Sequence, residues 1–417
     1  MNSEIYKDDV NNFNMHDFSV EDKKYMSLAV KLANKARGMT NPNPLVGAVI
    51  VKNGKIISTG YHKMIGCPHA EIEAINACSD KKLLKGSKMY VTIEPCSIYG
   101  ITPPCVDSII KYKFSEVIIG SIDPNPKVNG NGIKKLLEAK IKVKAGLLKD
   151  IIARQNEIFF KHIKAKRPFI CCKIAASIDG KVATKTSDSK WITGRNSRKM
   201  VQKIRREFEC ILTGINTIIA DDPYLYPREG LTVKPDIKGN KKFYRVILDS
   251  NLRISQDSNI VKTARTIKTL IFTAINGRVS KDINYSFNNC FNNDIFLKIE
   301  TLFNKGIEII NVKKISSEKL DIQEILDILY DKYTITSILV ESGPVLLTEL
   351  LKKNLIDKFL IFIAPKIIGG DSNYDIFSEL NISNANEATK LRFDEIKKIG
   401  GDILITAYPV SLYDYGV

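Results

Sequence analysis

Residues 69–71 read His-Ala-Glu, and residues 94–105 read Glu-Pro-Cys-Ser-Ile-Tyr-Gly-Ile-Thr-Pro-Pro-Cys. The imidazole of His69 and the thiols of Cys96 and Cys105 form a ligand set that is typical of zinc. Structural zinc sites usually close with four protein ligands, whereas three ligands leave the fourth tetrahedral position open for water. The two segments therefore predict a catalytic zinc site rather than a structural one.

Glu71 follows the histidine by two positions. In zinc-dependent nucleobase deaminases a glutamate at this spacing binds no metal and transfers protons during the reaction, so we predict that Glu71 is catalytic. A lone His-x-Glu often arises by chance, and free cysteines are often small buried hydrophobic residues. Finding all these parts in the expected order favours the functional interpretation. The spacing departs from the usual pattern, because residues 97–104 separate two cysteines that normally lie two residues apart.

The sequence around the three ligands predicts how they are held. Residues 88–93 alternate and are rich in β-branched and aromatic side chains, which predicts a strand that ends just before Cys96. Residues 70–77 and 105–112 have helical spacing of apolar residues. We therefore expect His69 and Cys105 at two helix starts, where the helix dipole favours a thiolate over a thiol.

The length of 417 residues and a hydrophobic content of 44% predict a soluble globular protein with at least two cores. The pattern changes near residue 166, so we expect a disordered extension over 1–21, a first domain over 22–166 and a second over 167–417. No run approaches about eighteen apolar residues, which predicts no membrane span. The N-terminus fits neither a signal nor a transit peptide. The eight cysteines form no disulfide framework, so we expect a cytoplasmic protein.

The formal net charge of +17 raises the possibility of nucleic-acid binding. The lysines are spread along the whole chain and are not interleaved with aromatic residues, so a solvated surface is the better interpretation. We therefore expect no nucleic-acid partner. A phosphorylated small substrate would still be attracted by this charge.

Helices and strands alternate in both halves of the chain, which predicts an α/β fold with layered sheets. In the first half we expect helices at 22–36, 70–77 and from 105, and strands at 47–51, 55–60, 88–93 and 116–120. One bridging helix is expected around 150–162. In the second half we expect strands at 169–175, 210–213, 244–248, 270–273, 307–312, 337–340 and 358–363, and a helix at 345–351.

These motifs together resemble a known family. The first half carries Asn-Pro-Asn-Pro-Leu-Val-Gly at 41–47, His-Ala-Glu at 69–71, Glu-Pro-Cys at 94–96, Gly-x-Thr-Pro-Pro-Cys at 100–105 and Asp-Pro-Asn-Pro at 123–126. The second half carries Lys-Ile-Ala-Ala-Ser-Ile-Asp-Gly at 173–180, Trp-Ile-Thr-Gly at 191–194, Ala-Asp-Asp-Pro at 220–223 and Val-Glu-Ser-Gly-Pro at 340–344. In this order they resemble the RibD family of bifunctional riboflavin biosynthesis proteins. The resemblance implies a cytidine-deaminase-like three-layer αβα domain followed by a dihydrofolate-reductase-like α/β domain.

The resemblance also implies two successive reactions. The first domain would use one zinc ion to remove an amino group from 2,5-diamino-6-(5-phosphoribosylamino)pyrimidin-4-one, with His69, Cys96 and Cys105 holding zinc and Glu71 as proton donor. The second domain would use NADPH to reduce the ribosyl side chain to a ribityl chain. We expect a homo-oligomer, of a size that the sequence does not give.

By the same resemblance, we expect NADPH contacts from Ala175, Trp191, Thr217, Asp221, Ser250, Gly343, Pro344, Val345, Leu346, Leu347, Thr348 and Glu349. We expect substrate contacts from Ser189, Arg205, Leu225, Arg228 and Glu341. No Gly-x-Gly-x-x-Gly follows a strand, so the helix start after Gly343 is the best place for a cofactor phosphate. That signal is weak by itself, because glycine and proline open many helices for structural reasons.

Several of these side chains have a structural alternative. The guanidinium groups of Arg205 and Arg228 suit a substrate phosphate, but the first could lie on a solvated helix face and the second in an ordinary loop. Trp191 could stack on a nicotinamide or simply pack in a core. Asp221 could end a helix or form a turn.

Two other functions fit parts of the sequence. One is a zinc-dependent tRNA deaminase with an accessory α/β domain, which the basic charge favours and the spacing of the two cysteines disfavours. The other is a non-enzymatic zinc module, which would need a fourth ligand that closes the site.

Overall fold

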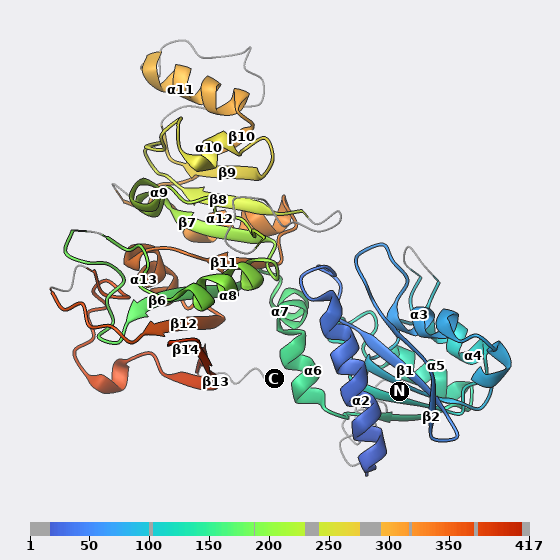
Figure 1. Cartoon of the computed structure of the whole chain (residues 1–417). Coiled ribbons are helices and arrows are strands. Elements are labelled where there is room, and N and C mark those ends of the chain that lie inside the picture. The colour runs from blue at the N-terminus through green and yellow to red at the C-terminus, as the bar shows by residue number, and fades with distance from the viewer. Residues whose placement is uncertain are drawn as a thin grey trace. The chain divides into compact units, whose positions relative to one another are not determined.

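The computed structural model describes residues 17–99, 103–186, 188–229, 242–275, 293–316, 319–370 and 374–410. The chain forms two compact units, the first ending at Lys166 and the second beginning at Arg167. Figure 1 traces the elements of each unit. The helix that opens the first unit starts at Val20, so the last residues of the expected N-terminal extension belong to this helix, and residues 1–16 lie outside the described part.

The first unit contains a five-stranded sheet with the order β2-β1-β3-β4-β5. Its strands are β1 (Gly47–Lys52), β2 (Lys55–Tyr61), β3 (Lys88–Ile93), β4 (Glu116–Ser121) and β5 (Lys142–Ala145). Its helices are α2 (Val20–Ala33), η2 (Asn34–Ala36), α3 (Ala70–Ala77), η3 (Lys81–Leu84), α4 (Cys105–Lys111), α5 (Asn131–Glu138), α6 (Lys149–Gln155) and α7 (Glu157–Ala165). Strand β1 is antiparallel to both its neighbours, whereas β3, β4 and β5 run parallel.

Both faces of this sheet are covered by helices. Along β1, Ala48 and Ile50 pack in one cluster with residues of α3, α4 and α5. Val49 and Val51 point to the other face and pack with residues of α2 and α6. This alternation follows from the two-residue period of a strand, and it confirms the expected three-layer αβα arrangement.

One expectation for the first unit was wrong. The bridging helix around 150–162 is two helices, α6 and α7, with a break at Asn156. The Asn156 side chain accepts a hydrogen bond from the Leu45 N–H at 2.7 Å and donates to the Leu45 carbonyl at 3.1 Å. Because this buried amide satisfies the backbone before β1, it stabilises the break.

The second unit contains a nine-stranded sheet with the order β10-β9-β8-β7-β11-β6-β12-β14-β13. Its strands are β6 (Phe169–Ser177), β7 (Cys210–Gly214), β8 (Tyr244–Leu248), β9 (Lys268–Thr273), β10 (Ile307–Asn311), β11 (Ser337–Val340), β12 (Lys358–Ala364), β13 (Leu391–Ile399) and β14 (Asp402–Pro409). Its helices are α8 (Arg195–Arg205), α9 (Ile215–Asp221), α10 (Asn259–Lys262), α11 (Asn293–Asn304), α12 (Ile322–Asp331), α13 (Pro344–Lys352) and η5 (Ala385–Glu387). In this order, every strand from β10 through β9, β8, β7, β11 and β6 to β12 runs parallel to its neighbours. The strands β14 and β13 add an antiparallel hairpin at one edge of the sheet.

The core of the second unit packs on the central strands and shares no described residue with the clusters of the first unit. Ile170, Cys172 and Ile174 of β6 lie in this core with Leu347 and Leu350 of α13. Each unit therefore has a hydrophobic core of its own, as the length of the chain predicts.

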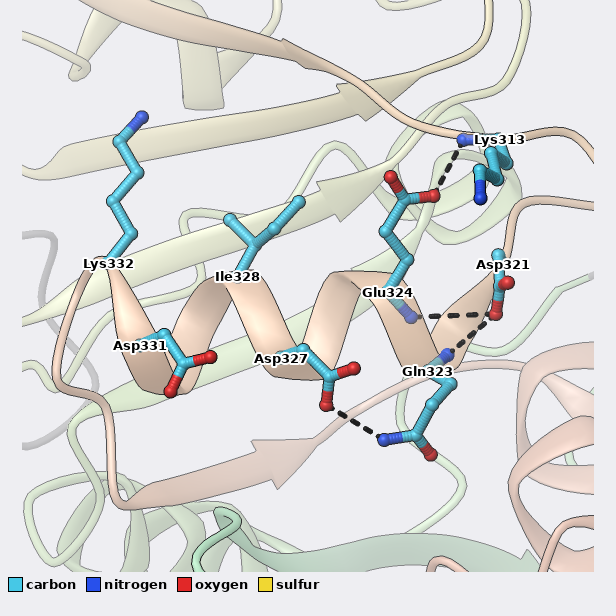
Figure 2. Close-up of a pocket in the computed structure, with 8 residues that line it drawn as sticks. All are labelled: Lys313, Asp321, Gln323, Glu324, Asp327, Ile328, Asp331 and Lys332. Carbon is cyan, nitrogen blue, oxygen red and sulfur yellow. Dashed lines mark hydrogen bonds between the residues drawn. The ribbon is translucent and has the colours of Figure 1, made fainter.

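Helix α12 illustrates how a surface helix of this unit begins. The side chain of Asp321 accepts hydrogen bonds from the Gln323 and Glu324 N–H groups, at 3.0 and 3.5 Å. The Glu324 carboxylate accepts from the Lys313 N–H at 2.9 Å (Figure 2). The shallow hollow along this helix in Figure 2 is lined by none of the predicted site residues. Within the described ranges, no helix is both long and apolar enough to span a bilayer.

Candidate functional site

The three predicted metal ligands of the first unit lie together at the carboxyl end of β3. His69 is the N-cap residue of α3, Cys105 is the first residue of α4, and Cys96 lies in the loop after β3. The Nδ1 atom of His69 lies 3.5 Å from the Cys96 sulfur and 3.3 Å from the Cys105 sulfur. The three ligand atoms all lie within 4.8 Å of one another.

This geometry fits zinc. Metal–ligand bonds of about 2.0–2.3 Å in a tetrahedron separate neighbouring ligand atoms by roughly 3.3–3.8 Å, close to the separations found here. The three residues form the only such cluster of histidine, cysteine and acidic side chains in the described part of the chain. Because the cluster contains three ligands, the fourth position is available to water and substrate.

The three ligand groups shift one another's pKa values through their hydrogen bonds. Hydrogen bonds from Cys105 and His69 lower the pKa of Cys96 to about 4. The hydrogen bond between His69 and Cys96 raises the pKa of His69 to about 9. The pKa of Cys105 is raised, first by its hydrogen bond with Cys96 and then by burial. One negative sulfur thus holds the other in the thiol form. A bound metal ion favours the thiolate of both cysteines.

Glu71 lies beside these ligands on the first turn of α3 and is only 3% exposed. Burial, followed by the charge of Cys96, raises the pKa of Glu71 to about 7. A carboxyl group that titrates near neutral pH can both give and take a proton. This property suits the role that the sequence predicts for it.

Glu94 and His62 support the zinc cluster, and neither was singled out from the sequence. The Glu94 carboxylate accepts hydrogen bonds from the N–H groups of Gly130 (3.0 Å), Gly132 (2.9 Å), Ile133 (3.3 Å) and Asp123 (3.4 Å). It therefore ties the segment before Cys96 to the start of α5. The buried ring of His62 lies 5.5 Å from that of His69 and hydrogen-bonds to Asn43 at 3.3 Å.

Gly132 gives a direct test of this support. A Cβ atom at this position would lie 2.3 Å from the Pro95 carbonyl oxygen and 3.1 Å from the Glu94 carboxylate. We expect Gly132→Ala to displace the segment that carries Cys96, to destabilise the first unit by about 1–3 kcal/mol and to lower its zinc content. Zinc per chain, measured by atomic absorption, checks this result. Gly401→Ala is the control, because a Cβ atom there meets nothing within 4 Å. Full zinc content in Gly132→Ala would contradict the expectation.

The predicted residues of the second unit gather at the carboxyl ends of its central strands. The neighbouring parallel strands β8, β7, β11 and β6 all end on this side of the sheet. Ligands of open α/β sheets bind at the carboxyl ends of the strands. Thr217 and Asp221 lie on α9 directly after β7, Ser250 follows β8, and Glu341 follows β11. Ala175 lies on β6. Residues far apart in the sequence thus meet at the carboxyl ends of these strands.

Glu341 is the carboxylate that contacts two cations at the carboxyl ends of these strands. Its carboxylate accepts two hydrogen bonds from the Arg205 guanidinium, at 2.6 and 3.0 Å, and lies 3.2 Å from the Lys173 ammonium. Arg205 is 8% exposed and also donates to the Tyr226 carbonyl at 3.3 Å. Arg205 is therefore not on a solvated helix face, and it already donates three hydrogen bonds within the unit. Lys173 was not predicted as a site residue, because its partner lies far away in the sequence.

The charge of Glu341 predicts a pH dependence for this unit. Burial alone would raise the pKa of Glu341, but Arg205 and Lys173 outweigh burial and lower it from 4.5 to about 2. An acid whose pKa is lowered by folding stabilises the folded state at pH values above the pKa of the unfolded chain. For Glu341 this contribution to the free energy of unfolding is about 3 kcal/mol. It is lost as the pH falls from 4.5 to 2.

We therefore expect the free energy of unfolding of the second unit to fall over that interval, and to fall less in Glu341→Gln. Urea titrations at several pH values measure it through the fluorescence of Trp191, the one tryptophan of the chain. An equal fall in both proteins would contradict this account.

Two predicted NADPH contacts, Trp191 and Asp221, and one predicted substrate contact, Ser189, differ in exposure and in their partners. Trp191 is 63% exposed, so it is not a core residue, and the Arg198 guanidinium lies 3.9 Å from its ring. Ser189 donates a hydrogen bond to Asp221 at 2.6 Å. Asp221 also ends α9, as its structural alternative predicts.

The segment after Gly343 forms the start of α13, with Gly343 as N-cap and Pro344 in the first turn. Leu347 and Thr348 are buried, and Thr348 accepts a hydrogen bond from the Ser378 N–H at 2.8 Å. Glu349 pairs with Lys319 at 3.2 Å. At the start of this segment, Gly343 and the exposed Val345 can therefore offer backbone N–H groups to a ligand, whereas Pro344 has none.

The loop 222–228 carries the other two predicted substrate contacts, Leu225 and Arg228. Leu225 is buried with a positive φ of 47°. The buried Nε atom of Arg228 has no hydrogen-bond partner, and the guanidinium lies 5.8 Å from the Tyr224 ring. Arg245 of β8, which is fully buried, donates to the Tyr224 carbonyl at 3.1 Å and holds this loop in place.

Comparison with known proteins assigns a family to each of the two units. Residues 19–121 match the cytidine and deoxycytidylate deaminase zinc-binding region, and residues 168–405 match the RibD C-terminal domain. The RibD protein of Aquifex aeolicus (strain VF5) is 37% identical over 92% of this chain and 97% of its own length. That of Actinobacillus pleuropneumoniae is 38% identical over 94% and 96%.

Solved structures give the same result. The RibD structure from Acinetobacter baumannii superimposes with a TM-score of 0.76 at 29% identity, and covers 94% of this chain and 99% of its own. The deaminase/reductase of Thermotoga maritima gives a TM-score of 0.75 at 31% identity, with 93% and 99% coverage. These matches confirm the expected fold class and an enzyme that combines a zinc deaminase with an NADPH-dependent reductase, and they do not favour the tRNA deaminase. The chain belongs to the RibD family of riboflavin biosynthesis proteins.

Proposed function

We propose that this chain deaminates 2,5-diamino-6-(5-phosphoribosylamino)pyrimidin-4-one in its first unit and reduces the ribosyl side chain of the product in its second. The observation that carries the proposal is the convergence of His69, Cys96 and Cys105 next to the buried Glu71. A RibD-type reductase domain follows in the same chain. Two successive reactions on one substrate agree with this combination.

In the first unit, His69, Cys96 and Cys105 would hold zinc. Bound zinc acts as a Lewis acid and makes water reactive at neutral pH. Glu71 then moves the protons: it accepts one from the attacking water and delivers one to the amino group that leaves as ammonia. Its buried position on the first turn of α3, beside the three ligands, supports both steps. Glu94 holds the loop of Cys96 during the reaction.

In the second unit, bound NADPH would supply a hydride to the opened ribose and leave as NADP+, and a proton would complete the reduction. The chain orients the two reactants: Trp191 with Arg198 offers a flat wall for the nicotinamide, and the start of α13 offers backbone N–H groups to a cofactor phosphate. Glu341 fixes Arg205 and Lys173 at the sheet edge. Arg228 supports a phosphate contact better than Arg205, because Arg205 already donates to Glu341 and to the Tyr226 carbonyl.

The substrate proposed is a phosphorylated pyrimidine rather than a nucleic acid, and the positive charge of the chain favours it. None of the cysteines of the described part is in a disulfide, which agrees with work in the cytoplasm. We further propose that the chain works as a homo-oligomer.

A paired assay on the zinc-loaded chain tests the proposal. Ammonia release from the diaminopyrimidine ribosyl phosphate is measured first, and NADPH oxidation is followed in the same tube. Both signals in sequence are expected. Ammonia without NADPH oxidation would overturn the proposal for the second unit, and deamination of tRNA in place of the pyrimidine would overturn it for the first.

A further inference from the structure

Trp191 has a backbone conformation that a large aromatic residue rarely adopts. Its φ angle is 66°, in the left-handed region. For residues other than glycine this region costs free energy, because the Cβ atom comes too close to the backbone, and such residues collect at functional sites. Trp191 is also 63% exposed, so it is not held by packing in a core. Polar contacts must therefore fix this conformation.

Lys366 makes one of these contacts. Its ammonium group donates a hydrogen bond to the Trp191 carbonyl at 2.7 Å, although the two residues lie 175 positions apart in the sequence. Lys366 stands two residues after the end of β12, and β12 runs parallel to β6 with Ala364 opposite Ser177. Lys366 therefore lies just past the carboxyl end of β12, next to the strand that carries Ala175, a predicted NADPH contact.

The segment that carries Lys366 is itself fixed. The Ile178 N–H donates to the Lys366 carbonyl at 2.9 Å. The Asp179 carboxylate accepts hydrogen bonds from the N–H groups of Ile368 at 3.2 Å and Gly369 at 2.7 Å. A contact made by a long side chain costs the entropy of ordering it, and a contact made by a loose loop costs the entropy of its backbone as well. Because the backbone here is already held, only the side chain of Lys366 has to be ordered.

Arg198 holds the indole ring of Trp191 separately. Its guanidinium lies 3.9 Å from the ring and donates a hydrogen bond to the Thr193 carbonyl at 2.8 Å. A cation in this position occupies one face of the ring, and the exposed remainder of the indole is available to a flat ligand. Lys366 thus holds the backbone of Trp191, and Arg198 holds its ring.

A chance contact of a surface lysine is the alternative. Exposed lysines often contact a neighbouring polar group with little effect on the fold. Chance, however, gives no reason why the contact falls on a carbonyl of a strained residue beside the predicted cofactor site, or why Asp179 holds the segment that provides the lysine.

We propose that Lys366 is a positioning residue of the reductase: through the Trp191 carbonyl it keeps the indole in the orientation that receives the nicotinamide ring. The inference rests on the NADPH site of the proposed function and adds a residue to it. Lys366 acts through Trp191 and not on the reacting atoms. Without its hydrogen bond, Trp191 returns to an ordinary φ angle and the indole turns away from the cofactor.

Lys366→Met tests this role, because it removes the hydrogen bond and keeps the length of the side chain. The KM for NADPH is expected to rise about three- to tenfold, with kcat at saturating NADPH and the KM for the pyrimidine changed by about twofold or less. Trp191 is the one tryptophan of the chain, so quenching of its fluorescence by NADPH reports the contact directly. We expect weaker quenching in Lys366→Met. Lys366→Arg, which can still donate, should recover most of both effects.

Asp179→Ala is a second, independent variant, because it releases the segment of Lys366 without changing the lysine. It should raise the KM for NADPH and weaken the quenching in the same way. Lys352→Met is the control: this exposed lysine is the last residue of α13, at the end of the helix away from Gly343. Its KM for NADPH and its quenching should match the wild type.

The wild-type chain separates the two possible failures. If NADPH is not oxidised by the wild type and does not quench Trp191, the proposed function of the second unit is wrong. If both signals occur in the wild type and Lys366→Met has the same KM for NADPH and the same quenching, only the role of Lys366 is wrong. A fall of kcat in Lys366→Met with no change in the KM for NADPH would also overturn that role.

Discussion

Glu71→Gln is expected to lower ammonia release by about 10²–10⁴-fold while zinc per chain stays unchanged. Glutamine keeps the shape of the side chain at its buried position on α3 but cannot exchange a proton. None of the three metal ligands is altered, so the metal remains bound. Single-turnover ammonia release and atomic absorption on the same sample measure the two quantities.

Glu73→Gln is the matched control for this experiment. It lies two residues further along α3, and its carboxylate forms a surface pair with Lys63 at 2.7 Å. Exposed pairs contribute little, so its ammonia release should match the wild type. NADPH-dependent reduction of the deaminated product should also be unchanged in Glu71→Gln. Turnover at the wild-type rate in Glu71→Gln would remove this residue from the mechanism.

Glu341→Gln is expected to destabilise the second unit by about 3–5 kcal/mol and to abolish reduction. The substitution removes the only charge that Arg205 and Lys173 contact in the described structure, and it leaves both cations at a buried sheet edge. Breaking one side of a buried ion pair is far more costly than losing a surface pair. Urea unfolding followed by Trp191 fluorescence measures the loss.

Glu308→Gln serves as its control, because Glu308 of β10 also contacts two lysines but lies at the surface. Its effect should be about 1 kcal/mol or less. Glu341→Asp keeps the charge and should recover part of the lost stability. If Glu341→Gln unfolds at the same urea concentration as the wild type, Glu341 does not hold this edge together.

Local patterns were enough to predict the zinc cluster. His69 and Cys105 stand at helix starts, and β3 and β8 have the bounds that the sequence predicts. The reason is that strand alternation and helix spacing are properties of a few neighbouring residues. The break at Asn156 was missed because the amide that stabilises it bonds to a residue of a distant loop.

The second site was harder to predict for the same reason. Lys173, Arg205 and Glu341 come from three separate elements, and no local pattern marks them as partners. The edge hairpin was also missed, because the apolar residues of 391–399 lie two, three and three positions apart and so break the two-residue period of a strand. Both features depend on which strands become neighbours in the sheet.

The separate cores of the two units have a genetic consequence. A substitution in one core leaves the packing of the other intact, so damage to the two halves of the chain is independent. A strain that makes only Glu71→Gln or only Glu341→Gln should need added riboflavin. A strain that makes both inactive chains should grow without it, since each chain supplies the step that the other lacks.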